Sequence, residues 1–582
     1  MALAPVVTVG GSELAQRWLD ALAELRVDLA VRTIGRCTMR FTDPGFVLAT
    51  TGTMSIGATV KVSGRALADR SAPATMFTGT ITAARLEQRG DRPAELVVTA
   101  EDAAFGLARR SRAQTYLEMS YSEAVKKVLS SAGVPAKVEN LAKSGDYILQ
   151  TDTDLAFIDE IARRTGWDWV VHDGTFHFWS SWKGSGRSGT IGAPVRLPVG
   201  DALESFTVDV SAAAPGSVTV RGWDPERQEA LVATAQADRS TVPDGLRRAF
   251  DPAQAGQADQ LTAVAGPADA KEAQVLADAH ARAAGHVTAR GRATVLPELR
   301  PGVQAEVSGL GPATGQYFVH EVEHLYRAGR FTTRFTAGDT TREEPATRSG
   351  SFTHAGLVVA TVTDVADPKK SGRVKVKYAA LSTEVTSGWA RVATPGAGTG
   401  RGLAFLPEVN DEVLVGFEDD DVRRPVVLGG LWGARTTAPP DLQDGEQVTT
   451  RKIVSRLGHV VELSDGTDAK SQHVLVSLAG GGHRLRLGKD AVDLEVPANV
   501  PLRITVGSSQ IALDGKGGVS ISGQTVQIDA KQSIELSAMD VQLKAKGTVA
   551  ASGAMAELKG TSTTTVQSSG VTAVKGGMVQ IN

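Results

Sequence analysis

The last quarter of this 582-residue chain constrains the fold most strongly, because residues 433–582 contain no Trp, Phe or Tyr. All eight Trp residues lie at or before Trp432. A globular domain of that length normally uses aromatic side chains, which bury the largest area per residue. The segment is therefore either disordered or built on a repeating plan with small core residues.

A regular repeat from residue 504 onward argues against disorder. Pairs of mostly apolar residues at positions i and i+2 recur in alternating steps of seven and eight residues almost to the end of the chain. Residues i and i+2 of a strand face the same side, and small or polar residues between the pairs suit turns. The repeat predicts a series of short strands whose core residues include Ile504, Val506, Ile511, Leu513, Val519, Ile521, Val526, Ile528, Ile534, Leu536, Val541 and Leu543.

Two inward residues per strand are too few to close a core within one chain, so such a repeat needs stacked neighbours. Three chains wound about one axis form a closed β-prism without free sheet edges, which otherwise invite aggregation. A single-chain β-solenoid is the alternative, although its coils usually exceed 15 residues. We predict a homotrimeric β-helical spike over residues 451–582, after a linker at 436–450.

Composition excludes several classes of protein. The chain has 62 Lys+Arg and 65 Asp+Glu, a net charge of −3, which gives no electrostatic case for a nucleic-acid or membrane-surface binder. The single cysteine, Cys37, excludes an intrachain disulfide and a Cys-based zinc site. The sequence around Cys37 does not decide whether it is a core or a surface residue. Neither a secretory-type start nor a run of about 20 apolar residues occurs, so we expect synthesis and assembly in the cytoplasm.

Residues 352–435 alternate as short strands separated by turn signals, which predicts a small Greek-key barrel such as an OB-fold. Single-stranded nucleic acid needs a basic groove, but this segment has ten basic and ten acidic residues. The acidic run Glu418–Asp421 could hold calcium, although a solvated hairpin turn is favoured. The expected strands are 357–362, 372–377, 388–392, 402–406, 412–417 and 425–428.

Two stretches of this segment resemble a known family. GLVVATVTDVADPKKSGRVKVKY (356–378) and GRGLAFLPEVNDEVLVGFEDDDVRRPVVLGGLWG (400–433) are similar to the OB-fold of contractile-tail spike proteins. The family includes the valine–glycine repeat proteins of type VI secretion and the cell-puncturing spikes of phage tails. In that family a trimeric β-helical needle follows the barrel directly, which agrees with the repeat.

The N-terminal part, residues 1–345, mixes helices and strands. We expect helices over 122–132, with a serine N-cap, over 154–164 and over 268–284, and a hairpin over 167–179. The stretches 150–178 and 299–337 resemble the hub of the same family. The resemblance implies a hub of two tube-like β-barrels per chain, which adapts a threefold spike to a sixfold tube. The expected fold class is mainly β with some α.

No local motif predicts catalysis or a resident metal. His320 and His324 lie four apart, but the strand-like alternation around them separates them by ~13 Å. His172 and His177 flank a turn and are interpreted as a surface pair. Glycines 396–402 lack the Lys-Ser/Thr of a phosphate loop. We therefore predict no enzyme activity, catalytic residues, metal or cofactor.

The resemblance implies a structural spike and hub of a contractile injection system. The homotrimer would dock on the inner tube and baseplate, could carry cargo or effectors, and would meet a target membrane only on firing. Its end would need a separate tip protein of the PAAR type. The residues expected at that junction are Met578, Val579, Ile581 and Asn582. The competing hypotheses are a tail-associated peptidoglycan or glycan hydrolase and a glycan-binding adhesin. The kind of contractile apparatus stays open among type VI secretion, an extracellular phage-like particle and a phage tail.

Overall fold

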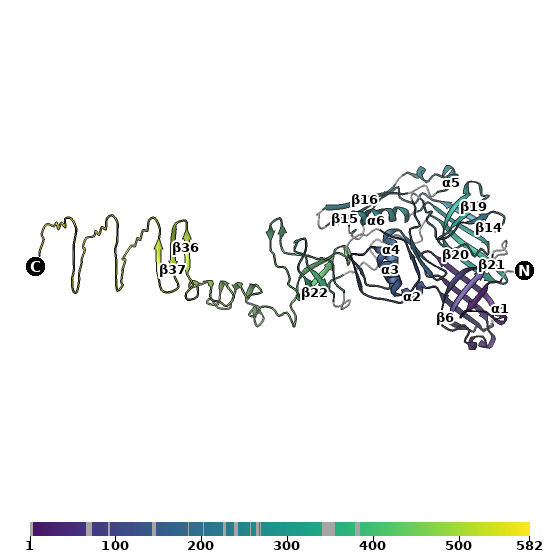
Figure 1. The fold of residues 1–582 in the computed structure, drawn as a ribbon, viewed down its shortest axis with the longest axis horizontal. Coiled ribbons are helices and arrows are strands. Elements are labelled where there is room, and N and C mark those ends of the chain that lie inside the picture. The colour runs from purple at the N-terminus through teal and green to yellow at the C-terminus, as the bar shows by residue number, and fades with distance from the viewer. Residues whose placement is uncertain are drawn as a thin grey trace. The chain divides into compact units, whose positions relative to one another are not determined.

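The computed structural model shows a mostly β protein that divides into two compact units, Met1–Ala438 and Pro439–Asn582 (Figure 1). We describe each unit by itself. The structure describes residues 4–65, 73–90, 93–141, 147–183, 186–201, 203–224, 229–237, 242–256, 258–263, 267, 269–283, 285–339, 356–378 and 385–581. The junction expected between hub and barrel, at 346–351, and the tip residue Asn582 lie outside the described residues.

One large sheet dominates the first unit. Its strands run in the order β14-β18-β21-β20-β3-β4-β7-β6-β5-β1-β2, and β13 and β19 join it through β20. All neighbours are antiparallel except β13 and β19. The bounds of these strands are β1 (Val6–Val9), β2 (Ser12–Glu13), β3 (Leu22–Ala30), β4 (Arg36–Thr42), β5 (Thr59–Gly64), β6 (Ala74–Glu87), β7 (Glu95–Glu101), β13 (Val195–Pro198), β14 (Leu203–Val210), β18 (Val287–Thr294), β19 (Gln304–Ser308), β20 (Gly315–Arg327) and β21 (Arg330–Gly338).

Each half of this sheet has its own apolar core. Strand β3 illustrates the alternation that builds such a core. Leu25 and Val27 are buried on one face, and Arg26 and Asp28 lie on the other face. The core under β1 and β3–β7 includes Trp18 and Phe41, whose ring centroids lie 5.0 Å apart. Cys37 is fully buried in this core. A second cluster packs under β13, β14 and β18–β21.

Two helices lie where the sequence predicts them, with one correction at a terminus. Helix α3 (Tyr121–Ser131) is capped by Ser120 and not by Ser122. The spacing of Ser120 and Glu123 forms a capping box, in which Ser120 Oγ accepts from the Glu123 N–H and the Glu123 carboxylate accepts from the Ser120 N–H. Helix α4 (Asp154–Thr165) ends at Gly166 with a φ of 66°.

The predicted hairpin and third helix are also present. Strands β11 (Asp168–His172) and β12 (Thr175–Trp179) pair around Asp173-Gly174. Helix α6 (Ala270–Ala283) packs on the sheet of β15 (Ser217–Asp224), β16 (Glu229–Gln236) and β17 (Asp259–Ala263). The expected helix ends at 268 and 284 lie outside the described residues. The shorter elements are α1 (Gln16–Ala21), α2 (Ala104–Ala108), α5 (Asp244–Ala249), β8 (Gln114–Leu117), β9 (Ala136–Val138) and β10 (Tyr147–Gln150).

The segment expected to form a barrel contains a five-stranded sheet of order β23-β22-β27-β28-β24. The strand expected at 402–406 is wrong for most of its length, because β26 covers Arg401–Gly402 and pairs with β25 (Ala397–Gly398) outside this sheet. The exposure of the apolar residues Leu403, Phe405 and Leu406 gives the reason, since their side chains have no core to join here. The strands of the sheet are β22 (Val358–Asp364), β23 (Lys375–Lys377), β24 (Arg391–Val392), β27 (Glu412–Phe417) and β28 (Pro425–Gly430).

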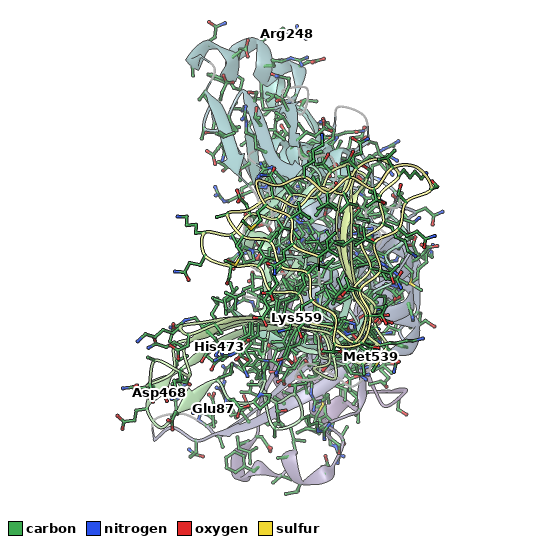
Figure 2. All side chains as sticks on the ribbon, turned by 90° about the vertical axis from the view of Figure 1, so that its left-hand side faces the viewer. Glu87, Arg248, Asp468, His473, Met539 and Lys559 are labelled. Atoms are coloured by element: carbon green, nitrogen blue, oxygen red, sulfur yellow. The ribbon has the colours of Figure 1, made fainter. Side chains whose placement is uncertain are left out.

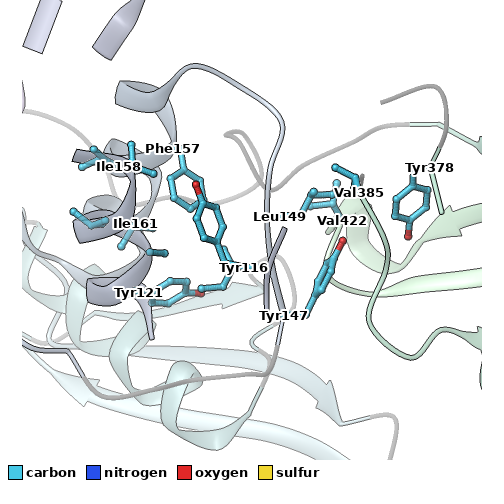
Figure 3. Close-up of a cluster of buried hydrophobic side chains, with 14 of the residues drawn as sticks. Tyr116, Tyr121, Tyr147, Leu149, Phe157, Ile158, Ile161, Tyr378, Val385 and Val422 are labelled. Atoms are coloured by element: carbon cyan, nitrogen blue, oxygen red, sulfur yellow. The ribbon is translucent and has the colours of Figure 1, made fainter. Parts of the chain in front are cut away.

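This sheet shares one apolar cluster with the helices of the first unit. The cluster includes Tyr116 and Phe157, whose stacked rings lie 5.4 Å apart, and Tyr147 and Tyr378 (Figure 3). It joins residues 104–178 with residues 358–427. Of the helices that the structure describes, none is long and apolar enough to cross a membrane.

The second unit is a succession of short antiparallel strands. A hairpin of β29 (Gln443–Asp444) and β30 (Gln447–Val448) precedes a five-stranded meander and a three-stranded one. From residue 523 to 581 the described chain contains no strand and runs back and forth (Figure 1). The meanders are β31 (Thr450–Val454), β32 (Val460–Ser464), β33 (His473–Ser477), β34 (Arg484–Gly488) and β35 (Val492–Glu495), then β36 (Leu502–Val506), β37 (Ser509–Leu513) and β38 (Val519–Ser522).

Candidate functional site: apolar sheet faces in the second unit

One face of the five-stranded meander carries an apolar row that crosses all five strands, and Arg451 lies at one edge of the same face. The register sets Ile453, Val461, Val476, Leu485 and Leu494 side by side, one from each of the five strands. A second row places Leu463, Val474, Leu487 and Val492 next to each other. Because side chains of a strand alternate between faces, these two rows share one face of the sheet.

The opposite face of the same meander carries charge. Lys452 Nζ lies 3.1 Å from Glu462 Oε2, and His473 Nε2 lies 3.2 Å from Glu462 Oε1. Arg484 forms a two-contact ion pair with Glu495 at 2.8 Å. His473 is labelled in Figure 2. Cross-strand pairs of opposite charge stabilise a sheet, and because they lie on the face opposite the apolar rows, the sheet is amphipathic.

Nothing in the described part of this unit covers the apolar face. The nine apolar side chains of the two rows are between 36% and 68% exposed. A contiguous patch of nine exposed apolar side chains on a folded protein marks an interaction surface. The face is therefore the strongest candidate for a functional surface in this unit.

The first half of the predicted spike core lies in the three-stranded meander. The register sets Ile504, Ile511 and Ile521 side by side, and Leu513 beside Val519. Val506 pairs with Ser509 at the edge of the same face. These side chains are also exposed in the chain by itself. The structure thus brings together the predicted core residues 504–521 on one face of a sheet.

The second half of the predicted core has no such strand partner among the described residues. The residues concerned lie in the described segment without strands and are between 52% and 73% exposed. Met539, in the same segment, is fully exposed (Figure 2). The expected tip residues Met578, Val579 and Ile581 are exposed as well. The exposed core residues are Val526, Ile528, Ile534, Leu536, Val541 and Leu543.

The two histidine pairs of the first unit differ in burial, since His320 and His324 are buried whereas His172 and His177 are half-buried. A β-bulge between Val319 and Glu321 interrupts β20 at His320. Burial holds the pKa of His324 at about 3, and the Arg300 charge adds to the effect. His172 and His177 face each other across the hairpin with ring centroids 5.7 Å apart. For the pair expected at the surface, burial lowers the pKa of both rings, and that of His172 to about 3.

The acidic run Glu418–Asp421 forms the turn between β27 and β28, in which Asp419 and Asp420 are exposed as expected for a solvated turn, whereas Glu418 is half-buried and Asp421 is buried. Asp421 is buried and holds Arg423 at 2.7 Å. Glu418 instead contacts Arg391 and Arg424. Because arginines already neutralise these carboxylates, the run is poorly suited to calcium. Among the described residues no group of three or more His, Cys, Asp or Glu side chains is placed to hold a metal ion.

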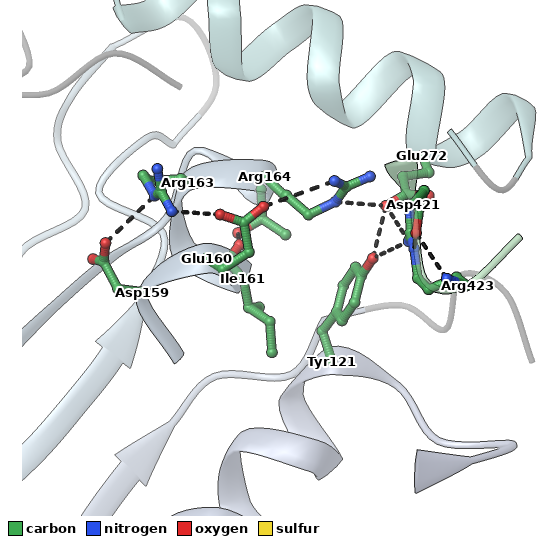
Figure 4. A network of polar contacts seen from close by, with 10 residues as sticks. Tyr121, Asp159, Glu160, Ile161, Arg163, Arg164, Glu272, Asp421 and Arg423 are labelled. Atoms are coloured by element: carbon green, nitrogen blue, oxygen red, sulfur yellow. Dashed lines mark hydrogen bonds and ion pairs between the residues drawn. The ribbon is translucent and has the colours of Figure 1, made fainter. Parts of the chain in front are cut away.

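Arg423 belongs to a buried ionic network that the sequence did not predict (Figure 4). Its guanidinium contacts Glu272 at 2.9 Å, and Tyr121 donates to the same carboxylate at 2.7 Å. Arg164 reaches Glu272 at 3.2 Å. The network ties the loop between β27 and β28 to α3, α4 and α6. The only signal for it in the sequence is the arginine pair Arg423-Arg424, which follows the acidic run after Val422.

Parts of this chain are similar to known proteins. The family model described as the type VI secretion system/phage-baseplate injector OB domain matches residues 358–432, which hold the five-stranded sheet and its loops. By this match and by the relatives named below, the chain resembles the class of VgrG-like spike proteins. A second family model, described as the Alg8 N-terminal domain, matches residues 5–327, which is more than half of the chain. The chain belongs to the family that this domain defines.

Two curated relatives are spike proteins of type VI secretion systems. VgrG3 of Vibrio cholerae is 34% identical over 110 residues, which cover 18% of this chain and 11% of the relative. VgrG1a of Pseudomonas aeruginosa is 36% identical over 75 residues, which cover 12% of each chain. The chain therefore spans about a tenth of the length of the curated relatives it matches.

Two solved structures align with much of this chain. The c3393 protein of E. coli, described as a component of the type VI secretion system, covers 71% of this chain and 96% of its own, with 15% identity and a TM-score of 0.43. A Francisella PdpA–VgrG complex covers 89% of this chain and 88% of its own, with 7% identity and a TM-score of 0.49.

Proposed function

We propose that this chain is the non-enzymatic spike and hub protein of a contractile injection system. Three copies would bring their apolar faces together about one axis, as a closed prism over residues 451–582. The observation that carries the proposal is the amphipathic meander, which has an apolar face with no cover inside the chain. Burying one Val, Leu or Ile side chain completely contributes roughly 1.5–3 kcal/mol, so a trimer gains from every row.

The same reasoning extends along the repeat. The proposed spike core consists of the twelve alternating residues from Ile504 to Leu543, whose apolar side chains are exposed in the isolated chain. Pairing between chains would supply the backbone hydrogen bonds that the described segment after residue 522 lacks within one chain. Stiffness of the spike follows from this pairing and from a dry apolar axis.

Residues 1–345 of the first unit would serve as the hub. Its large sheet has two separate cores, one under each half, which supports two tube-like barrels per chain. Three such chains would present six barrels to an inner tube and baseplate. The sequence ranges proposed are 1–345 for the hub, 352–435 for the OB-fold barrel, 436–450 for the linker and 451–582 for the spike. We further propose that the particle assembles in the cytoplasm and that its spike punctures a target envelope when a sheath contracts.

Electron cryo-microscopy of the full chain tests the proposed architecture. The expected result is a particle with a threefold axis along the second unit. Single chains with a closed solenoid in that unit would contradict it. Clearing of a cell-wall suspension by the purified chain would favour the hydrolase hypothesis instead.

The exposed end suits a separate PAAR-type tip, held by Met578, Val579, Ile581 and Asn582. The first three side chains are apolar and exposed, as a capped prism end requires before it is capped. A chain shortened by residues 578–582 should form the same oligomer but fail to retain a PAAR-type protein on a size-exclusion column. Retention by both chains would place the tip elsewhere.

A further inference from the structure

The first unit contains a small cavity that the proposed spike function does not use. It has a volume of about 20 Å³ and lies where α4 and α6 end and β11 begins. Four guanidinium groups line it, and the only carboxylate among the lining residues is that of Asp168. The four are Arg32, Arg163, Arg187 and Arg282.

Arg187 is the most constrained of these cations. Its side chain is 3% exposed, and its guanidinium lies 4.3 Å from the centre of the Phe318 ring. Nε donates to Ser181 Oγ at 3.1 Å, and Nη2 donates to Asp168 at 2.8 Å. Nη1 is buried and has no hydrogen-bond partner among the described residues. A buried donor on a charged group that lacks an acceptor costs free energy, so the position invites an acceptor.

The acidic side chains nearby are already engaged. Asp159 accepts two hydrogen bonds from Arg32, at 3.0 and 3.2 Å, and also lies 3.4 Å from Arg163 (Figure 4 shows Asp159 and Arg163). Arg282 stacks 5.5 Å from the Trp182 ring centre and forms no ion pair with a described residue. The cavity wall therefore carries more positive than negative charge.

The backbone at the cavity is also unusual. Arg32 has a φ of 57°, in the left-handed region that non-glycine residues rarely adopt. Its N–H donates to the Trp169 carbonyl at 2.8 Å, and its side chain is held by Asp159. Residues kept in strained conformations gather at ligand sites, where the surrounding structure holds them.

From these observations we propose that the cavity binds one small monovalent anion of halide size, such as chloride. A water molecule needs about 10–15 Å³ on the same measure, so the space admits one ion of that size but not sulfate or a carboxylate side chain. The anion accepts from Arg187 Nη1 and balances the charge of Arg282. An ordered water would supply the acceptor but not the charge, which makes the two occupants separable.

Anomalous diffraction from crystals of the full chain soaked in bromide locates the ion. We expect a peak in this cavity. In solution, tryptophan fluorescence reports the first unit, which contains all eight Trp residues. Its unfolding temperature should rise as chloride replaces gluconate at constant ionic strength. No bromide peak, or equal unfolding temperatures in both salts, would mean that the cavity holds only water and would overturn the proposal.

Two substitutions assign the effect to the cavity. Arg282→Gln removes a charge without breaking the Asp168 pair, and it should raise the half-maximal chloride concentration about tenfold, the change expected for one charge-assisted contact. Arg290→Gln is the matched control, since Arg290 is exposed on β18 and pairs with Asp209. It should leave the chloride dependence unchanged. An equal rise of the half-maximal chloride concentration in both variants would indicate general screening of charge by salt. It would contradict binding of the anion in this cavity.

Discussion

At the scale of single residues, the buried ionic network has the largest structural consequence. Four carboxylates and four guanidinium groups form it, and they come from distant parts of the sequence. Because all of them are buried or half-buried, each depends on its partners for compensation of its charge. Glu160 lies 3.8 Å from Arg164 and thereby joins Asp159, Arg163 and Arg32 to the residues around Arg423. The members are Arg32, Asp159, Glu160, Arg163, Arg164, Glu272, Asp421 and Arg423.

Removing Arg423 should destabilise the first unit strongly. Arg423→Met leaves the Asp421 and Glu272 carboxylates buried without their shared cation, and breaking a buried pair in this way costs about 3–5 kcal/mol. Urea unfolding followed by tryptophan fluorescence measures the change. The control is Arg334→Met, on a half-exposed side chain of β21, which should change the midpoint little. Similar midpoints for both variants would show that the network contributes nothing.

The buried histidines should make the first unit sensitive to acid. Thr333 Oγ1 accepts from the Leu296 N–H and lies 3.0 Å from His324 Nδ1, so it can donate to a neutral imidazole. The pKa of His324 is lowered to about 3 in the fold, whereas the unfolded chain takes up the proton near pH 6.5. Stability is therefore lost as the pH falls from about 6.5 toward 3.

His324→Gln tests this sign. It should reduce the slope of unfolding free energy against pH between 4 and 6.5 by up to roughly 1.4 kcal/mol per pH unit, the value for one proton. Denaturant titrations at a series of pH values supply the slope. An unchanged slope in the variant would show that His324 is protonated to the same extent in both states.

At the scale of elements, the end of α4 determines how closely α6 approaches. Gly166 has a positive φ, and a Cβ at this position would lie 3.0 Å from the Cβ of Ala279 on α6. The position thus combines two reasons for glycine. One is the left-handed cap conformation, and the other is close helix packing.

Gly166→Ala should therefore destabilise the first unit by about 1–3 kcal/mol, since strain and crowding add. Ala132→Gly, at the C-cap of α3, is the contrasting substitution. The backbone of Ala132 is right-handed, so glycine relieves no strain at this position. Thermal unfolding monitored by tryptophan fluorescence compares the two. Tolerance of alanine at 166 would show that α6 moves away without cost.

Local sequence patterns predicted those helices and hairpins whose ends are fixed by nearby residues. Helix α4 and the hairpin of β11 and β12 carry their own caps and turn, so their sequences sufficed. The N-cap of α3 was misplaced by two residues because two serines compete, and only Ser120 has Glu123 at capping-box spacing. Residues 403–406 looked like a strand because they are apolar, yet their side chains are exposed. The ionic network depends on contacts across more than 100 residues, which no local pattern records.

At the scale of the whole molecule, the second unit is organised by the contrast between its two sheet faces. The predicted core residues 504–521 lie on one face, and polar side chains such as Arg503 and Gln510 alternate with them. A chain alone leaves that apolar face in water. The proposed trimer removes it from water, which explains why the repeat continues without aromatic residues.

A charge on the apolar face should prevent this assembly. Ile511→Lys places an ammonium group in the proposed axis, and an unpaired buried charge is costly enough to keep the chains apart. Gln510→Lys, at the neighbouring position on the other face, is the matched control and should assemble normally. Sedimentation velocity distinguishes the species. Trimers in both variants would place Ile511 outside the core.

The native mass of the full chain, by light scattering with and without SDS, tests the central claim most directly. The proposed intertwined prism predicts a mass of three chains that persists in SDS. A mass of one chain would mean that the repeat closes within a single polypeptide. The trimeric spike, and with it the role of a threefold hub, would then be contradicted.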